Sequence, residues 1–414
     1  MRKTGRTGAC LCELTWGIAV CCAFATVAGA TVCESETSYA KDELQKYVDS
    51  GEMPGAVCVF YKDGVQETSC IGYADYETKR PITLDCAYMQ CSQTKGFCGV
   101  SVALLVEEGR LGLDDSVSKY LPEFSKLWLL ESESNGVRRL VRVKNDLTIR
   151  MCLNHTGGFS FELPNYTRMG GWSRRMPLRS VAATAAAHPL NFEPGTKITY
   201  SNVGIDVAAA VVEVVSGMRW EDFLRKRVFE PLGMTASGFW PTERQLEGRI
   251  RLYKVEGGKK AERLDEVSWM QSPYGDDRVF PSAGAGLWTT ARDQLKFYKM
   301  LLNLGLGENG VRILKEDTVR TLLAVSSRKK GLEGYSLGLQ APDGDHPDAW
   351  FGHGGAWGTW CSMNWHKKEL LLWAVQFTGD GPRPWKQDRS AASRKFFQHV
   401  TDTSSVDAYT GRLK

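Results

Sequence analysis

Two strand-like runs stand near the start of the chain, an apolar one at 55–61 and a mixed one at 66–73. Both runs are rich in β-branched and aromatic residues and flank an Asp63-Gly64 pair, a combination typical of an antiparallel β-hairpin. A third extended run, Ala87 to Cys91, follows, and directly after it the apolar residues take up helical spacing. The pattern therefore predicts a strand that leads straight into a helix.

Helical spacing dominates the middle of the chain. Apolar residues recur at helical intervals from Thr94 to Glu108, and Gly109 ends that pattern. Residues 110–275 are predicted to be mostly helix and polar loop, with prolines as punctuation. The other predicted helices are a short amphipathic one at 41–50, Val203 to Val215, Trp220 to Val228 and Thr290 to Asn303.

Strand patterns return near the end of the chain. Gly358 to Trp365 and Leu370 to Phe377 read as a second hairpin, and Ser390 to Val400 as a closing helix. Strands at both ends with helices between them predict one sheet built from both ends. The expected fold class is α+β, a mixed and largely antiparallel sheet flanked by helices. The sheet should come from about 45–95 and 280–400 and the helical region from about 110–275, all in one domain at 31–402 with a tail at 403–414.

The first thirty residues differ in character from the rest. A basic start is followed by an apolar run from Leu14 to Val27 and by the small residues Ala28-Gly29-Ala30. This order is typical of a secretory signal peptide at 1–30, cleaved near Thr31, and it predicts a secreted or periplasmic protein. A buried helix or a retained membrane anchor is the alternative, although the run is too short to span a bilayer comfortably.

Net charge gives no reason to expect a nucleic-acid partner. The 414 residues carry a net charge of +4, of which three basic residues and one acidic residue in the first thirty contribute +2. The remaining +2 (4 − 2) is too small to indicate an acidic partner. No later stretch is long and apolar enough to predict a membrane span once the signal is removed.

Eight cysteines follow Ala30, and export would permit disulfides between them. Eight cysteines allow 105 complete pairings, so the connectivity is left open. Cys58 and Cys70 flank the predicted hairpin turn: a three-residue loop would place them directly opposite each other, and a two-residue loop would put them on opposite faces. Cysteine and histidine spacing does not predict a metal site.

The junction of strand and helix carries the first candidate chemistry. In Cys91-Ser92-Gln93-Thr94-Lys95, the serine and the lysine lie three residues apart and share a helix face. A serine hydroxyl needs a neighbouring base to act as a nucleophile, and partial burial lowers the pKa of a lysine toward that role. A helix N-terminus supplies backbone N–H groups for an oxyanion.

This signal is weak in isolation, because Ser-x-x-Lys begins at five serines: Ser38, Ser92, Ser116, Ser326 and Ser327. At least four of these matches are chance, and the ordinary interpretation of Ser92 is a helix cap with a solvated lysine behind it.

Two further segments stand in suitable places. Tyr200-Ser201-Asn202 precedes an apolar helix, where a phenol could exchange the serine proton and Asn202 could donate to a substrate amide. The alternative is a packed tyrosine beside a helix cap. His353-Gly354-Gly355-Ala356 lies at the start of the second hairpin; glycines there permit close approach of backbone to substrate, and the Ala356 N–H could share an oxyanion hole with that of Ser92. Each segment has a competing match, Ser362-Met363-Asn364 for the first and His155-Thr156-Gly157-Gly158 for the second.

The order Ser-x-x-Lys, Tyr-x-Asn, His-x-Gly resembles the serine β-lactamase and penicillin-binding-protein superfamily over about residues 40 to 400. Within it, the chain is similar to class C β-lactamases, family VIII carboxylesterases and D-amino-acid peptidases. Supporting stretches are Gly109-Arg110-Leu111-Gly112-Leu113-Asp114-Asp115, Leu121-Pro122-Glu123-Phe124, Thr148-Ile149-Arg150 with His155-Thr156-Gly157-Gly158, Phe229-Glu230-Pro231-Leu232-Gly233-Met234 and Ala283-Gly284-Ala285-Gly286-Leu287-Trp288-Thr289-Thr290.

The resemblance implies roles for matched residues only. Ser92 falls on the family's nucleophile, Lys95 on its lysine, Tyr200 on its tyrosine base and Asn202 on its substrate-binding asparagine. The family's third motif, Lys-Thr-Gly, is His353-Gly354-Gly355 here, as among esterase-like members. A histidine is only partly charged near neutrality, so it is a poorer partner than lysine for the carboxylate of a β-lactam.

The implied activity is hydrolysis of a small ester, amide or peptide through an acyl-enzyme on Ser92, without metal or organic cofactor. An esterase is favoured over a true β-lactamase. The alternatives are a D-amino-acid peptidase or carboxypeptidase, a weak β-lactamase, and a non-hydrolytic penicillin-binding or sensor protein on the same scaffold, since a fold does not fix a function.

Overall fold

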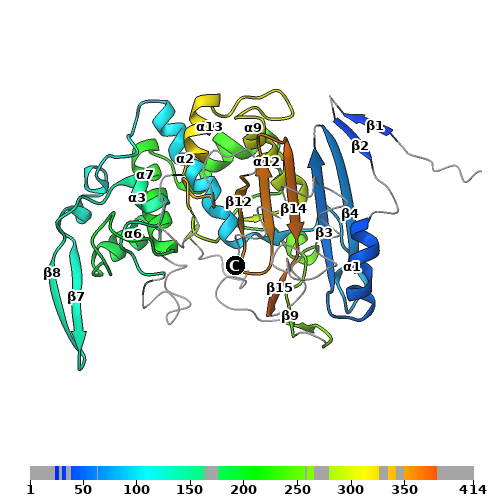
Figure 1. Ribbon diagram of the computed structural model, residues 1–414, viewed down its shortest axis with the longest axis horizontal. Coiled ribbons are helices and arrows are strands. Elements are labelled where there is room, and N and C mark those ends of the chain that lie inside the picture. Colours follow the sequence, from blue (N-terminus) through cyan, green and yellow to red (C-terminus); the bar gives the residue numbers. More distant parts are fainter. Residues whose placement is uncertain are drawn as a thin grey trace, which may run out of the picture.

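Strands from both ends of the chain form one sheet in the computed structural model (Figure 1). The structure describes residues 24–27, 30–33, 39–62, 64–161, 163, 176–256, 259–264, 279–325, 334–341 and 349–379. The early hairpin is β3 (Gly55–Lys62) and β4 (Val65–Asp75), and β3 pairs antiparallel with β14 (Glu369–Ala374) of the late hairpin. This arrangement confirms the predicted sheet, and it brings residues about 300 positions apart into register, such as Lys62 opposite Glu369.

The sheet has eight strands in the order β1-β2-β4-β3-β14-β13-β12, with β5 paired to β4 beside this path. The remaining members are β1 (Phe24–Val27), β2 (Ala30–Cys33), β5 (Arg80–Pro81), β12 (Phe351–Gly354) and β13 (Trp360–Asn364). The pair β1 and β2 falls on the region predicted to be the signal peptide and its cleavage point, and β2 runs parallel to β4.

Both faces of the central strands are buried, which explains the unbroken apolar run in β14. Leu370, Leu372 and Ala374 join the large core on the side of α2 (Thr94–Glu107) and α12 (Ala291–Leu302). The intervening Leu371 and Trp373 join a second core with Leu44 and Val48 of α1 (Tyr39–Asp49). A strand covered on both faces loses the alternation of a half-exposed strand.

The helical region packs around α7 (Asn202–Ser216), whose residues 202–212 are all buried. Its neighbours are α2, α3 (Ile149–Leu153), α6 (Leu178–Ala186) and α8 (Trp220–Leu224), which continues as a turn of π-helix at Arg225–Phe229. The other short elements are α9 (Glu230–Leu232), α10 (Glu243–Glu247), α13 (Glu316–Leu323), β6 (Tyr88–Met89), β9 (Tyr253–Val255), β10 (Glu262–Arg263), β11 (Trp288–Thr289) and β15 (Phe377–Gly379).

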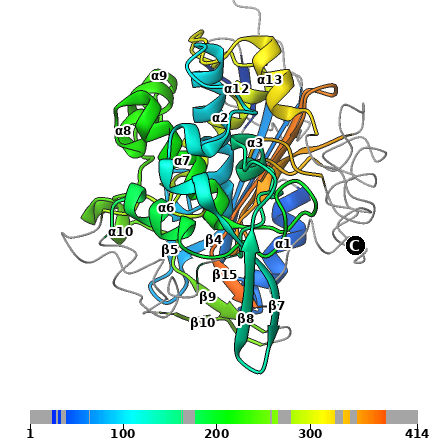
Figure 2. The same cartoon turned by 90° about the vertical axis from the view of Figure 1, so that its left-hand side faces the viewer.

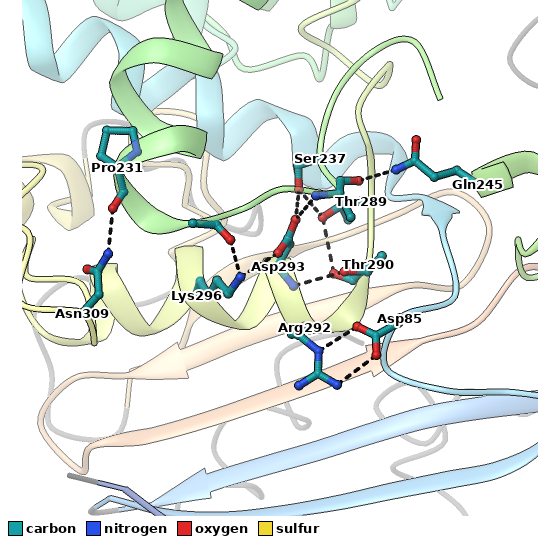
Figure 3. Close-up of polar contacts among 12 residues, drawn as sticks. Asp85, Pro231, Ser237, Gln245, Thr289, Thr290, Arg292, Asp293, Lys296 and Asn309 are labelled. Atoms are coloured by element: carbon teal, nitrogen blue, oxygen red, sulfur yellow. Dashed lines mark hydrogen bonds and ion pairs between the residues drawn. The ribbon is translucent and has the colours of Figure 1, made fainter. Parts of the chain in front are cut away.

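The first turn of α12 ties the helical region to the sheet side (Figure 3). Thr290 caps the helix by accepting from the Asp293 N–H, and the Asp293 carboxylate in turn accepts from the Ala236 N–H at 2.7 Å. Arg292 forms a two-pronged ion pair with Asp85, at 2.7 and 2.9 Å. These bonds hold the strand pair β6–β11, which leads into Ser92, against the loop after α9.

One hairpin contradicts the expectation of a helical region at 110–275. β7 (Trp128–Ser134) and β8 (Val137–Arg142) form an exposed antiparallel arm that projects from the body (Figure 2). The sequence does contain its signal, an Asn135-Gly136 pair between two alternating runs, which favours a tight turn. Both turn residues have positive φ, as such turns require.

The early hairpin settles the geometry of one cysteine pair. Lys62 pairs with Val65, so the loop has two residues, and Cys58 lies opposite Ser69 while Cys70 lies opposite Val57. The two thiols therefore point to opposite faces of the sheet and cannot bridge each other.

The predicted helices that fall on described residues are confirmed within one or two residues at each end, apart from the region after Trp220, where a π-helical turn replaces α-helix. The closing helix at Ser390 to Val400 and the tail at 403–414 lie outside the described residues. Among the helices that the structure describes, none combines the length and the apolar character needed to cross a membrane.

Candidate active site

Ser92 lies at the passage from strand to helix. A 3-10 turn at Cys91–Gln93 follows β6 and continues directly into α2, so Ser92 precedes the helix by two residues. Cys91 has φ of +53°, a left-handed conformation that is uncommon for a residue with a side chain. This sharp turn leaves the Ser92 side chain half-buried beside the first turn of the helix.

Lys95 is fully buried and has three oxygen neighbours. Its Nζ lies 3.1 Å from Ser92 Oγ, 2.7 Å from Asn202 Oδ1 and 2.6 Å from the Gly284 carbonyl oxygen. The predicted pairing of Ser92 with Lys95 is therefore present in the geometry. At Ser116, the other described match to Ser-x-x-Lys, the lysine binds Asp115 and the serine binds Ser118.

The three contacts of Lys95 orient its lone pair. Asn202 Oδ1 and the Gly284 carbonyl can only accept hydrogen bonds, so each takes one N–H of Lys95 in either protonation state. A protonated Lys95 donates its third N–H to Ser92 Oγ. A neutral Lys95 has two N–H groups only, and its lone pair then points toward the Ser92 hydroxyl, where it can accept the proton.

Tyr200 contacts both the serine and the lysine. Its hydroxyl is hydrogen-bonded to the Ser92 side chain, and Lys95 Nζ lies 4.6 Å from the centroid of its half-buried ring. Burial raises the pKa of Tyr200 well above its ordinary value, and nearby Tyr335 raises it further, whereas the bond to Ser92 opposes the rise. The phenol is therefore protonated near neutrality.

Asn202 begins α7 and touches the lysine from a different element. Ser201 caps the helix by accepting from the Gly204 N–H at 3.2 Å, which places Asn202 in the first turn. One turn later, the buried Asp206 accepts from the N–H groups of Ala283 and Gly284 at 2.7 and 3.2 Å. Asp206 thereby holds the Gly284 carbonyl in place for Lys95.

His353 is buried on β12, with 2 % of its surface exposed. Its Nδ1 lies 2.7 Å from the Gly354 carbonyl, so Nδ1 carries the proton, and Nε2 has no partner among the described residues. Burial lowers the pKa of His353 to about 3, and the Lys95 ammonium adds to the effect. The side chain is neutral and, in this conformation, faces the rings of Tyr200 and Tyr335 rather than solvent.

Gly355 brings the turn after β12 against the loop of the nucleophile. A Cβ at this position would lie 2.1 Å from Thr359 Oγ1 and 2.6 Å from the Gln90 carbonyl oxygen, so no larger residue fits without displacement. Ala356 is exposed on the same turn, and its N–H and that of Trp357 reach the Cys91 sulfur, a weak acceptor. Ala356 is thus beside the residue that precedes Ser92.

Four further residues belong to this arrangement: His155, Asp206, Gly284 and Tyr335. His155 stood in the competing His-x-Gly match, and the structure places it within the site on a different side of Tyr200, with ring centroids 4.6 Å apart. Gly284 stood in one of the stretches that carry the family resemblance. Asp206 and Tyr335 had no motif of their own in the sequence.

The site consists of a hydroxyl between an amine and a phenol, with backbone N–H groups of a turn nearby. This arrangement suits acyl transfer, since the hydroxyl can give up its proton locally while a carbonyl is attacked. No group of three or more His, Cys, Asp or Glu side chains suited to a metal occurs in the part of the chain that the structure describes.

Comparison with known proteins agrees with the geometry. Residues 40–392 match the family described as Beta-lactamase. Protein Rv1367c of Mycobacterium tuberculosis is 27 % identical over 363 residues, which cover 81 % of this chain and 89 % of that protein. Protein flp of Staphylococcus aureus is 24 % identical over 242 residues, covering 57 % of this chain and 46 % of that protein.

Solved structures share the fold at low identity. EstCE1, described as a hydrolase with promiscuous acyltransferase activity, superposes with a TM-score of 0.69 at 22 % identity, covering 89 % of this chain and 97 % of that one. Simvastatin synthase (LovD) from Aspergillus terreus gives a TM-score of 0.71 at 20 % identity, covering 90 % and 99 %. With the fold, the site geometry and a match over most of its length in agreement, this chain belongs to the β-lactamase family.

Proposed function

We propose that the protein is an exported serine hydrolase that cleaves esters through an acyl-enzyme on Ser92. One observation carries the proposal: Ser92 Oγ lies 3.1 Å from a buried Lys95 that also donates to two obligate acceptors. A lysine held in this way gives up no hydrogen bond to a carbonyl when it loses its proton. It therefore acts as the base that activates the serine.

The reaction proceeds in two steps on this geometry. Ser92 Oγ bonds to the substrate carbonyl carbon while its proton passes to Lys95. The Ser92 N–H binds the resulting oxyanion together with the Ala356 N–H, which exchanges its weak bond to the Cys91 sulfur for the stronger acceptor. Tyr200, a neutral phenol bonded to Ser92, transfers a proton to the departing alkoxide and is reprotonated from Lys95. Water then takes the place of the alcohol, and its attack on the acyl carbon releases the acid and restores Ser92.

The substrate is an ester whose acyl part is neutral near the scissile bond. The position that holds a lysine in β-lactamases holds the buried, neutral His353 here, which offers no cation to a substrate carboxylate. EstCE1, which shares the fold, is described as a hydrolase with acyltransferase activity, the same class of chemistry as the one proposed here.

Fluorophosphonate labelling tests the nucleophile. A fluorophosphonate probe should add to one serine, and peptide mapping should find the adduct on Ser92. Ser92→Ala should abolish labelling, whereas Ser116→Ala, which changes the other described Ser-x-x-Lys match, should leave it intact. An adduct on Ser38, Ser116, Ser326 or Ser327 in the unmodified protein would contradict the assignment.

A substrate panel tests the ester preference. A short-chain chromogenic ester should be turned over far faster than nitrocefin or a D-aminoacyl anilide. If nitrocefin turnover equalled ester turnover, the argument from His353 would be wrong. Labelling of Ser92 without turnover of any member would favour a penicillin-binding or sensor protein.

The export proposal rests on residues 1–30 alone. A basic start, an apolar run and small residues before Thr31 have the order of a cleaved signal. N-terminal sequencing of secreted material should begin at or near Thr31, and an intact Met1 would refute cleavage.

A further inference from the structure

The segment from His155 to Phe161 is hydrogen-bonded to the backbone on both sides of Tyr200. The Thr199 N–H donates to the His155 carbonyl at 2.9 Å, and the Ser201 N–H donates to His155 Nδ1 at 3.2 Å. The Asn202 N–H donates to the Phe161 carbonyl at 3.0 Å. His155 therefore bonds to the backbone on both sides of Tyr200, once through its own backbone and once through its ring.

The ring of His155 also packs directly on Tyr200. It is 2 % exposed, and its centroid lies 4.6 Å from that of Tyr200 and 4.6 Å from that of Tyr335. Because the Ser201 N–H can only donate, Nδ1 must be the acceptor, and the proton of the neutral ring is on Nε2. Burial holds the pKa of His155 well below its ordinary value, with smaller contributions from Lys95 and His353, so the ring is neutral at neutral pH.

The backbone of His155 is in a conformation that few residues adopt. Its φ is +66°, in the left-handed region, where histidine is tolerated better than most side chains but at a cost in free energy. Such strain persists where the surrounding structure fixes the residue, and it is frequent at active sites. Here the strained conformation is what allows both the carbonyl and the ring of one residue to face the same loop.

We propose that His155 is a positioning residue that holds the Tyr200 hydroxyl on Ser92 for proton transfer. This inference rests on the proposed function, since it concerns the same acyl transfer. His155 acts by fixing the backbone before and after Tyr200 and by packing on its ring. A misplacement of about 1 Å in such a group lowers a rate by about a hundredfold.

Two substitutions separate the acceptor from the backbone strain. His155→Asn and His155→Gly both tolerate positive φ, so neither adds strain. Asparagine carries an acceptor oxygen the same number of bonds from the backbone as Nδ1, and glycine carries none. We expect kcat for ester hydrolysis to fall about a hundredfold in His155→Gly with little change in KM, and to return to within about tenfold of the original value in His155→Asn.

A second background tests whether His155 acts through Tyr200. In a Tyr200→Phe protein, adding His155→Gly should change kcat by less than about threefold, because the group to be positioned is already gone. His188, a half-buried histidine that follows α6, provides the matched controls. His188→Asn and His188→Gly should leave kcat unchanged. Melting temperatures of all variants establish that the folded protein is being measured.

The outcomes distinguish this inference from the proposed function. A protein that neither labels with fluorophosphonate at Ser92 nor turns over esters refutes the proposed function. An active protein in which His155→Asn is as slow as His155→Gly, or in which His155→Gly costs the same factor with and without the Tyr200 hydroxyl, refutes the positioning role alone. Folded His155→Gly with unchanged kcat refutes it as well.

Discussion

Lys95 and His353 are two buried basic side chains in the same site, with 0 % and 2 % of their surfaces exposed. Lys95 has three oxygen neighbours within 3.1 Å, enough for every hydrogen of an ammonium group. His353 has one such neighbour, the carbonyl of the next residue, and its Nε2 has no partner among the described residues. Lys95 and His353 are thus almost equally buried, but they differ strongly in the number of oxygen atoms near their nitrogen atoms.

The surroundings of these two buried bases, rather than their residue types, therefore determine which protonation states each can adopt. The oxygen atoms around Lys95 can accept its hydrogen bonds in either protonation state, a geometry that suits proton exchange with Ser92. The surroundings of His353 support the neutral ring only, and the Lys95 charge lowers the pKa of His353 further. We infer that Lys95 is placed for proton exchange and His353 for packing, and variants at four positions test that contrast.

Lys95→Ala should have the largest effect. It removes the base beside Ser92, and kcat for ester hydrolysis should fall by at least two to four orders of magnitude, about the contribution of positioned acid–base groups. It also leaves two buried acceptors without a donor, which costs about 1–3 kcal/mol each in stability. Steady-state kinetics and thermal unfolding measure the two effects separately. Lys95→Arg keeps the cation but not the proton exchange and should be similarly slow; a fast Lys95→Arg enzyme would show that charge alone suffices.

Tyr200→Phe should follow closely, with a fall of about two to four orders of magnitude. The loss should appear in kcat and kcat/KM alike, because the contact acts in the transition state. Stability should fall by only about 0.5–1.5 kcal/mol, the net contribution of one hydrogen bond. Near-normal rates in this variant would mean that the tyrosine packs like His353 and takes no part in the reaction.

The double variant Lys95→Ala with Tyr200→Phe should lose little more than Lys95→Ala alone, because groups that act as a unit are non-additive. Kinetics of the four proteins in the cycle give the coupling. Fully multiplicative losses would indicate that the amine and the phenol act in independent steps.

Gly355→Ala should lower kcat by a smaller factor, because it changes the turn that follows His353. The added methyl would meet Thr359 Oγ1 and the Gln90 carbonyl, so the turn must move away from Cys91. Overpacking of this kind costs about 1–3 kcal/mol, and we expect kcat to fall about tenfold as Ala356 shifts. Gly238→Ala is the control, because a Cβ there meets nothing within 4 Å. Equal melting temperatures for both variants would show that the turn tolerates displacement.

His353→Asn should have the smallest effect near neutral pH and a distinct one in acid. The unfolded histidine takes up a proton below its ordinary pKa of 6.5, whereas the folded one does so only near 3. The unfolded state therefore binds more protons between these values, and the free energy of unfolding falls as pH falls, by about 1.4 kcal/mol per pH unit for this residue. Unfolding by urea at pH 7 and pH 4.5 should show a weaker acid loss in His353→Asn. Identical losses in both proteins would mean that the folded histidine is protonated.

The strands and helices that enclose the site were predictable because their patterns are local. The hairpin at 55–73 follows from its β-branched and aromatic residues and its turn residues, and the helix after Ser92 follows from helical spacing. The β7–β8 arm has one local signal, the Asn135-Gly136 turn, but it lies in a segment whose prolines and polar loops favour helix and loop. Most residues of the arm are exposed, so no buried apolar face marks its strands in the sequence.

The candidate site was predictable only where a motif carried it. Ser92, Lys95, Tyr200 and Asn202 stood in motifs, and the structure brings all four together. The role of His155 depends on its tautomer and left-handed backbone, which no local pattern specifies. Asp206 reaches the site indirectly: it accepts from the Gly284 N–H and so positions the Gly284 carbonyl beside Lys95. Tyr335 contributes by packing its ring near that of Tyr200. Neither residue has a signature in the sequence.

The pairing of β3 with β14 has a consequence for the order in which the chain is made. Glu369, the first residue of β14, lies 307 positions after its partner Lys62. At about 5–20 residues per second, a ribosome needs about 15–60 seconds to synthesise the interval. During that time β14 is not yet available to pair with one edge of β3. The N–H and C=O groups of that edge can then pair with other chains. The nascent protein therefore depends on whatever shields that edge until its final strands emerge.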